Sequence, residues 1–194
     1  MNTLRSPIVG ILLAAGRGTR FDPAGQQDKL LQRLSGGQPV AGQSARNLKA
    51  VVDRVVAVVR PGQQQLLQVL QDAGCETTVC LDADQGMAAS LQQGLALAGD
   101  AQGWLIALAD MPFVAADTLQ KLRDAVEQGH DIVVPTFEGR RGNPVAFSRH
   151  HLAALRQLRG DEGARSLLAN FPVHKVEVMD PGIHRDIDTP GDLA

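Results

Sequence analysis

Short apolar runs and longer amphipathic stretches alternate along the chain as far as Pro135. Most of the runs consist of Val, Ile, Leu and Ala without interruption, which is typical of strands buried on both faces of a sheet. We expect five such strands, at Ile8–Leu13, Arg54–Val59, Thr77–Leu81, Trp104–Ala109 and Asp131–Pro135.

Three of the stretches between these runs have the features of helices, and each is followed at once by a glycine. In the first of them apolar residues recur at helical spacing, and a glycine behind the last turn is a common helix end. We expect these helices at Gln63–Ala73, Met87–Ala98 and Ala116–Gln128. The alternation of strand and helix predicts an α/β fold, a three-layer α/β/α sandwich of Rossmann-like type around a mostly parallel sheet.

The pattern changes after Pro135, where the elements become shorter. It predicts a short strand, two helices, a late strand that runs antiparallel to the others, and a short helix that starts at Thr189-Pro190. The first four lie at Asn143–Phe147, Leu152–Arg159, Glu162–Asn170 and Val173–Val178. We expect this second half of the chain to cover part of the functional site.

Length and composition fit one globular domain, because 194 residues with 44% hydrophobic and 21% charged residues can bury a substantial core. The formal net charge of −2 argues against nucleic-acid binding, which needs a basic face. No apolar run is long enough to cross a membrane. The run behind Arg5 is short for a signal peptide and is interrupted by Gly10, so we expect a cytoplasmic protein without membrane contact.

Several common functional signatures are missing from the sequence. Cys75 and Cys80 are too few for a disulfide framework and form no CxxC pair, so we expect buried, reduced thiols. The five histidines include no HExxH pattern, and Ser44, Ser90 and Ser166 have no G-x-S-x-G setting. Neither a zinc protease nor a serine hydrolase is indicated.

A glycine-rich loop, Gly16 to Arg20, follows directly on the first expected strand. Glycines allow a backbone to turn its N–H groups toward a phosphate, and two arginines suit the several charges of a nucleoside triphosphate. The loop is neither a Walker A motif nor a dinucleotide fingerprint, since Phe21 stands where the third glycine would be. A plain connecting turn is the alternative.

Lys29 stands shortly behind this loop, in the segment "DKLL". A lysine in that setting usually marks the solvated end of a helix or strand. Together with the glycine loop, it becomes a candidate for a second clamp on the same phosphates.

Asp110 follows the expected strand Trp104–Ala109, and ligands of α/β proteins bind at the carboxyl ends of strands. Mg²⁺ takes one or two carboxylates together with substrate phosphates, so Asp110 is a candidate metal ligand. Its alternative role is a cap, but Asp117 already fits as the cap of the next helix. In "DIDTP", Asp186 and Asp188 lie on the same side if the segment is extended, and either could instead be a cap.

The sequence resembles the MobA-like nucleotidyltransferases. The motifs "LLAAGRGTRF", "DKLL", "GMAASL", "LADMP", "GRRGNPVAF", "RGDEGARSLL" and "DIDTP" occur in the order seen in that family and span most of the chain. The set most resembles the molybdenum cofactor cytidylyltransferase branch, because the chain reads "LAAG" where guanylyltransferases usually read "LAGG". A departure is the loop "DPAGQQ" before Lys29, which is longer than the family's usual turn.

The resemblance implies a fold of the nucleotide-diphospho-sugar transferase type and a single domain over residues 1–194. The N-terminal half would bind the nucleotide and the C-terminal half the acceptor. The reaction would be CMP transfer from CTP to the phosphate of a molybdopterin-type acceptor, with Mg²⁺ and with release of pyrophosphate. The product could then reach a client molybdoenzyme.

Site residues follow from the same resemblance. Those implied for nucleotide binding are Leu13, Ala14, Ala15, Gly16, Arg17, Gly18, Thr19, Gly86, Met87 and Ser90. Arg20, Lys29 and Asp110 would be catalytic, and Asp110 and Asp188 would bind the metal, with Asp186 as the second choice. The acceptor would meet Arg140, Arg141, Asn143 and Arg165.

Two alternatives remain open. The same fold could use GTP and the same acceptor, or could act on a sugar phosphate or polyol phosphate. The chain could also be a non-catalytic carrier that holds the pterin cofactor and passes it to a molybdoenzyme. The joint presence of Lys29, Asp110 and Asp188 argues against the carrier, which would have little use for all three.

Overall fold

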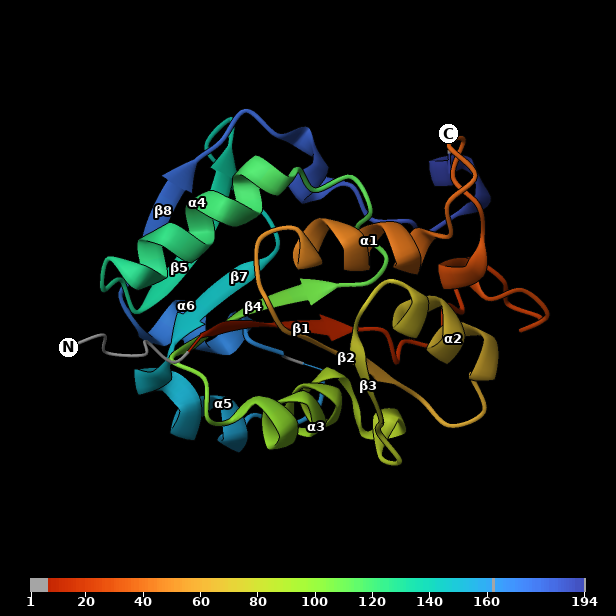
Figure 1. Ribbon diagram of the computed structural model, residues 1–194, viewed down its shortest axis with the longest axis horizontal. Helices are drawn as coiled ribbons and strands as arrows, with labels where there is room; N and C mark the ends of the chain where they lie inside the picture. The colour runs from red at the N-terminus through yellow and green to blue at the C-terminus, as the bar shows by residue number, and fades with distance from the viewer. Residues whose placement is uncertain (1–6, 162, 194) are drawn as a thin grey trace.

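The computed structural model describes residues 7–161 and 163–193, and an eight-stranded sheet runs through the middle of the molecule (Figure 1). The order across the sheet is β3–β2–β1–β4–β7–β5–β6, and β8 pairs with β5. The strands are β1 (Ile8–Leu13), β2 (Val55–Val59), β3 (Glu76–Val79), β4 (Gly103–Leu108), β5 (Ile132–Phe137), β6 (Arg140–Arg141), β7 (Val145–Ser148) and β8 (His174–Glu177).

Helices cover both faces of this sheet, which confirms the predicted three-layer sandwich (Figure 1). One layer consists of α1 (Val40–Lys49), α2 (Gln64–Asp72) and α4 (Ala116–Glu127), and the other of α3 (Met87–Ala98), α5 (Leu152–Gln157) and α6 (Arg165–Asn170). Neighbouring residues of a strand enter opposite cores, as Ile11 and Leu12 do, because side chains alternate along a strand. Short 3₁₀ helices span Lys29–Leu31, Ala83–Gln85, Arg149–His151, Pro181–His184 and Pro190–Leu193.

Most predicted elements are present with small shifts at their ends, and Ile8–Leu13 and Met87–Ala98 have the predicted bounds. The helix predicted from Glu162 begins at Arg165, and Glu162 itself lies outside the described residues. The prediction missed α1, whose buried face is made largely of small residues and therefore gives a weak apolar pattern. Within residues 7–161 and 163–193, no helix has the length and apolar character needed to span a membrane.

The predicted antiparallel orientation of the late strand is wrong, because β8 runs parallel to β5. The antiparallel strands are instead β6 and β7. A two-residue turn, Glu138-Gly139, has positive φ at both positions and folds β6 back on β5. β7 then ends beside Gly103 at the amino edge of the parallel strands, and α5 and α6 return the chain to that same edge. From there β8 must run in the direction of β5.

The predicted cap of α4 is also wrong. The helix begins at Ala116 with Ala115 as its N-cap, so Asp117 lies inside the first turn. The buried carboxylate of Asp180 takes over the capping, accepting hydrogen bonds from the Ala115 amide (2.9 Å) and the Thr118 hydroxyl (2.7 Å). A cap supplied from a distant segment leaves no local pattern in the sequence.

Both cysteines are free and buried, as predicted. Burial raises the pKa of the Cys75 thiol to about 11. At pH 8 about one Cys75 thiol in a thousand is then ionised, and only the thiolate reacts with alkylating reagents. We expect Cys75 in a Cys80→Ala variant to resist iodoacetamide at pH 8 and to react fully in guanidinium chloride, as measured by intact mass. Rapid labelling of the folded variant would contradict this.

The sheet has a switch point between β1 and β4. β1 pairs in parallel with β2 on one side and with β4 on the other, while the chain visits β2 and β3 before it returns to β4. Connections leave such neighbouring strands in opposite directions and open a crevice at their carboxyl ends. The glycine loop after β1 and Asp110 after β4 both start at this edge.

Candidate functional site

A cavity of about 620 Å³ lies at the carboxyl ends of β1 and β4. It brings together every residue predicted for nucleotide binding, catalysis and metal binding, except the second-choice ligand Asp186. Its described lining consists of residues 13–21 together with Lys29, Leu30, Ala83, Asp84, Gly86, Met87, Ser90, Leu108, Asp110, Asp161 and Asp188. Segments far apart in the sequence therefore meet at one edge of the sheet.

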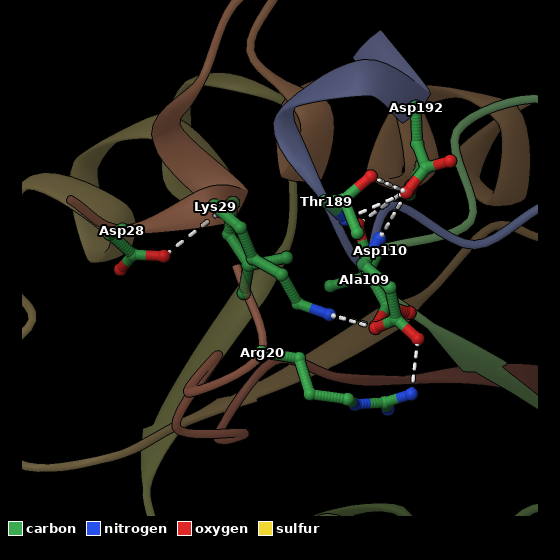
Figure 2. Close-up of polar contacts among 10 residues, drawn as sticks. Arg20, Asp28, Lys29, Ala109, Asp110, Thr189 and Asp192 are labelled. Carbon is green, nitrogen blue, oxygen red and sulfur yellow. Dashed lines mark hydrogen bonds and ion pairs between the residues drawn. The ribbon is translucent and has the colours of Figure 1, made fainter. Parts of the chain in front are cut away.

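Lys29 and two carboxylates form the most enclosed charged group of this cavity (Figure 2). The Lys29 ammonium donates to Asp110 Oδ2 at 2.7 Å and to Asp188 Oδ1 at 3.2 Å, and the side chain of Lys29 is only 11% exposed. The Arg20 guanidinium reaches the other oxygen of Asp188 from the solvent side. Two cations thus contact these two carboxylates.

Main-chain bonds bring the two carboxylates to the same place. The Ile187 amide donates to the carbonyl of Asp110 at 2.8 Å, which sets Asp188 next to Asp110. Asp192 fixes the following turn by accepting from the amides of Asp188 (3.1 Å) and Thr189 (2.7 Å), and Figure 2 shows Asp192 beside Thr189. Burial raises the pKa of Asp186, and the negative charges of Asp188 and Asp110 raise it further.

The long loop before Lys29 is well ordered by its own hydrogen bonds. Asp22 accepts from the amides of Ala24, Gln26 and Gln27, and these bonds hold the pKa of Asp22 below its ordinary value. Asp28 then caps the 3₁₀ helix that carries Lys29 by accepting from the Leu30 amide at 2.9 Å. The extra length of the loop therefore does not displace Lys29 from the carboxylates.

Asp110 carries a feature that fits a divalent cation. Its Oδ1 atom is buried and has no hydrogen-bond partner among the described residues, although a buried carboxylate oxygen without a partner is costly. Residues 7–161 and 163–193 contain no cluster of three or more acidic, histidine or cysteine ligands. Two carboxylates would leave the remaining coordination positions to phosphate oxygens and water, which is the way Mg²⁺ usually binds.

The glycine loop is open toward the cavity and is fixed at its outer end. Gly18 has a φ of +64°, and its carbonyl accepts from the Phe21 amide at 2.9 Å, so the loop makes a tight turn. Arg17 donates to Asp84 at 3.0 Å, and Arg60 contacts the same carboxylate. The two guanidinium groups hold the pKa of Asp84 below its ordinary value. Sequence reasoning missed Asp84 because no motif marks it.

Another part of the cavity wall is formed where α3 begins. Gly86 has a φ of +108°, and a Cβ there would lie 2.5 Å from the carbonyl carbon of Gly160. The Ala88 amide donates to the Gly160 carbonyl at 3.0 Å. This close packing brings Asp161 into the lining, a residue that the "RGDEGARSLL" motif contains but that was not predicted for the site.

Three of the residues predicted for the acceptor, Arg140, Arg141 and Asn143, do not belong to the described lining of this cavity. Arg140 and Arg141 are exposed on β6, and Asn143 lines a separate, much smaller cavity next to Ser44 and Asn47. Arg165 starts α6. Their role in acceptor binding stays a prediction.

Comparisons with known proteins show which family and which solved structures this chain is similar to. Residues 10–177 match the MobA-like NTP transferase domain. The chain is 31% identical to the purine catabolism protein PucB of Bacillus subtilis (strain 168), over 96% of this chain and 95% of PucB. It is also 31% identical to the "Probable molybdenum cofactor guanylyltransferase" of Natronomonas pharaonis, over 66% of this chain and 61% of that protein.

Crystal structures of Rv0371c from Mycobacterium tuberculosis H37Rv have the same fold. One superposes with a TM-score of 0.83 at 28% identity, covering 98% of this chain and 96% of Rv0371c. A second, a complex with manganese, has a TM-score of 0.79 at 27% identity and covers 96% of each chain. These likenesses confirm the predicted fold, and a relative of this chain binds a divalent cation.

Proposed function

Because the chain belongs to the MobA-like NTP transferase family, we propose that it transfers CMP from CTP to the phosphate of a molybdopterin-type acceptor. An oxygen of the acceptor phosphate forms a bond to the α-phosphorus, the bond from that phosphorus to the bridging oxygen breaks, and pyrophosphate leaves. The acceptor itself supplies the nucleophile, so the protein has to align the two substrates and stabilise charge.

The observation that carries this proposal is the contact of Lys29 with both Asp110 and Asp188 on a cavity that the glycine loop borders. In this proposal Asp110 and Asp188 hold Mg²⁺, which offsets negative charge on the phosphates when it is bound. Lys29 turns to the α-phosphate, and Arg20 with the backbone of the glycine loop stabilises the leaving pyrophosphate. The partnerless Oδ1 of Asp110 supports the metal role.

We place the base and ribose along Leu13 to Gly16 and against the start of α3 at Gly86, Met87 and Ser90. Met87 is half exposed to the cavity and Ser90 is buried at its wall, so together they offer one apolar and one hydroxyl contact. The whole chain would act as one domain, with Arg140, Arg141, Asn143 and Arg165 on the acceptor side. The likeness to a guanylyltransferase favours GTP as the second candidate nucleotide.

Pyrophosphate release tests the proposal directly. Purified protein, Mg²⁺ and molybdopterin would be incubated with CTP, GTP, ATP and UTP in parallel. We expect release with CTP alone. Release with GTP alone would assign the chain to guanylyl transfer, and release only with a sugar phosphate or polyol phosphate as acceptor would replace molybdopterin. Tight cofactor binding without release under any condition would favour the carrier.

A further inference from the structure

Helix α1 contributes no residue to the lining of the nucleotide cavity, yet its polar side chains face the turn that carries Asp110. The hydroxyl of Ser44, which is 5% exposed, donates to the carbonyl of Ala109 at 2.9 Å. The amide nitrogen of Asn47 donates to the carbonyls of Pro112 (2.8 Å) and Val114 (3.0 Å). Two side chains of α1 therefore hold three main-chain carbonyls in the segment from Ala109 to Val114, which we call the Asp110 turn.

Asn47 is itself fixed by its neighbour on the helix. The Gln43 side-chain amide donates to Asn47 Oδ1 at 2.7 Å, so the orientation of the Asn47 amide is determined and both of its N–H groups point at the turn. A side chain held at three positions has little rotamer freedom left, which makes it a stiff support.

These bonds act on Asp110 through its own main chain. The Ala109 amide donates to the Leu13 carbonyl at 3.0 Å, while the Ala109 carbonyl accepts from Ser44. The carbonyl of Asp110 accepts from the Ile187 amide. The peptide groups on either side of Asp110 are thus held by β1, by α1 and by the segment before Asp188. The Asp110 side chain can then move only by rotation about its own bonds.

We propose that Ser44 and Asn47 are positioning residues, which hold the Asp110 turn so that the Asp110 carboxylate meets the metal and Lys29 in one orientation. This inference rests on the proposed nucleotidyl transfer. Groups that orient a metal ligand from behind typically change metal affinity or activity about 10- to 100-fold when they are removed. A purely structural role would change stability and leave the metal requirement unaltered.

The test compares Ser44→Ala with two matched variants. Ser44→Thr keeps the hydroxyl. Trp104→Phe removes another buried bond from a side chain to a main-chain carbonyl, the one from the Trp104 indole to Ala98 at 2.8 Å, at the opposite end of β4. Asn47→Ala is the second test variant in case Ser44→Ala does not fold. For each protein we would measure kcat, the nucleotide KM, the Mg²⁺ concentration for half-maximal rate, and hydrogen exchange of the Ile187 amide.

We expect Ser44→Ala and Asn47→Ala to lower kcat and raise the Mg²⁺ requirement about 10- to 100-fold, with a nearly unchanged nucleotide KM. The Ile187 amide should exchange faster in both, Ser44→Thr should restore wild-type values, and Trp104→Phe should change stability alone. The inference is overturned if Trp104→Phe shifts the Mg²⁺ requirement and the Ile187 exchange as much as Ser44→Ala does.

Hydrogen exchange keeps this test separate from the proposed function. If the wild-type chain releases no pyrophosphate with any nucleotide, the proposed function fails, and the Ile187 amide still reports on the Asp110 turn. Faster exchange in Ser44→Ala than in Trp104→Phe then supports the positioning role, and equal exchange overturns it.

Discussion

Asp110→Asn is expected to lower kcat for pyrophosphate release about 100- to 1,000-fold, the size of effect seen when one preorganised charge-stabilising group is lost from an active site. The neutral amide removes one negative charge from the pair that would hold the divalent cation, and Lys29 keeps its 3.2 Å contact with Asp188. Asn has nearly the shape of Asp, so the unfolding temperature should stay within about 4 °C of that of the wild type. Steady-state kinetics and thermal unfolding would measure both quantities.

Asp117→Asn is the matched control for this substitution. Asp117 is an exposed carboxylate paired with Lys121 on α4 and lies outside the cavity lining. We expect its removal to leave kcat unchanged, because exposed ion pairs contribute little. Near-normal turnover of Asp110→Asn would rule out the metal role of Asp110, whatever the other variants do.

Gly86→Ala should have the second large effect, a loss of both folding stability and kcat/KM. An alanine there must adopt a φ of +108° and place its Cβ 2.5 Å from the carbonyl carbon of Gly160. Together with a ψ of −179°, this φ lies in a region that essentially only glycine adopts, and the backbone strain costs about 1–3 kcal/mol. The overlap with main-chain atoms adds about 1–3 kcal/mol, since neither backbone can yield by a simple rotamer change. The displaced loop should also lower kcat/KM about 10- to 100-fold, because it carries Asp161 at the cavity wall.

Gly129→Ala separates these two costs. Gly129 follows α4 with a φ of +100°, and a Cβ there would meet no atom within 4 Å. Its substitution should therefore cost only the backbone strain and leave the kinetics unchanged. Urea unfolding and nucleotide titration of both variants would measure the difference. Equal stabilities and equal KM values for the two variants would show that the contact with Gly160 is unimportant.

The sequence predicts the first strand of the sheet and α3 well, because each carries its signal locally. β1 is a continuous apolar run, and α3 is a helix with a glycine at each end. The meeting of the glycine loop with Asp110 at one cavity was also predictable, since the loop after β1 and Asp110 after β4 must meet wherever these two strands are neighbours. The motif order supplied Lys29 and Asp188, which lie far from both in sequence.

Features that depend on distant partners could not be predicted in this way. Asp84 enters the site only because Arg17 and Arg60 converge on it, and Asp180 caps a helix 65 residues away from it in the chain. The orientation of β8 is set by the edge to which α5 and α6 return the chain, and no residue of β8 encodes that edge. The bonds from α1 to the Asp110 turn likewise need the packed structure.

The charges around the cavity have a consequence for how quickly a nucleotide arrives. Its described lining holds three cationic side chains, Arg17, Arg20 and Lys29, and four acidic ones, Asp84, Asp110, Asp161 and Asp188. The cavity lining has a slight excess of negative charge, and the whole chain has a formal net charge of −2. A triphosphate without a bound metal ion is therefore not attracted over long range. Encounter is then limited by diffusion and orientation, and added salt should not slow it. In the proposed reaction, discrimination would begin only at contact, when the phosphates replace Asp110 and Asp188 as partners of Lys29 and Arg20.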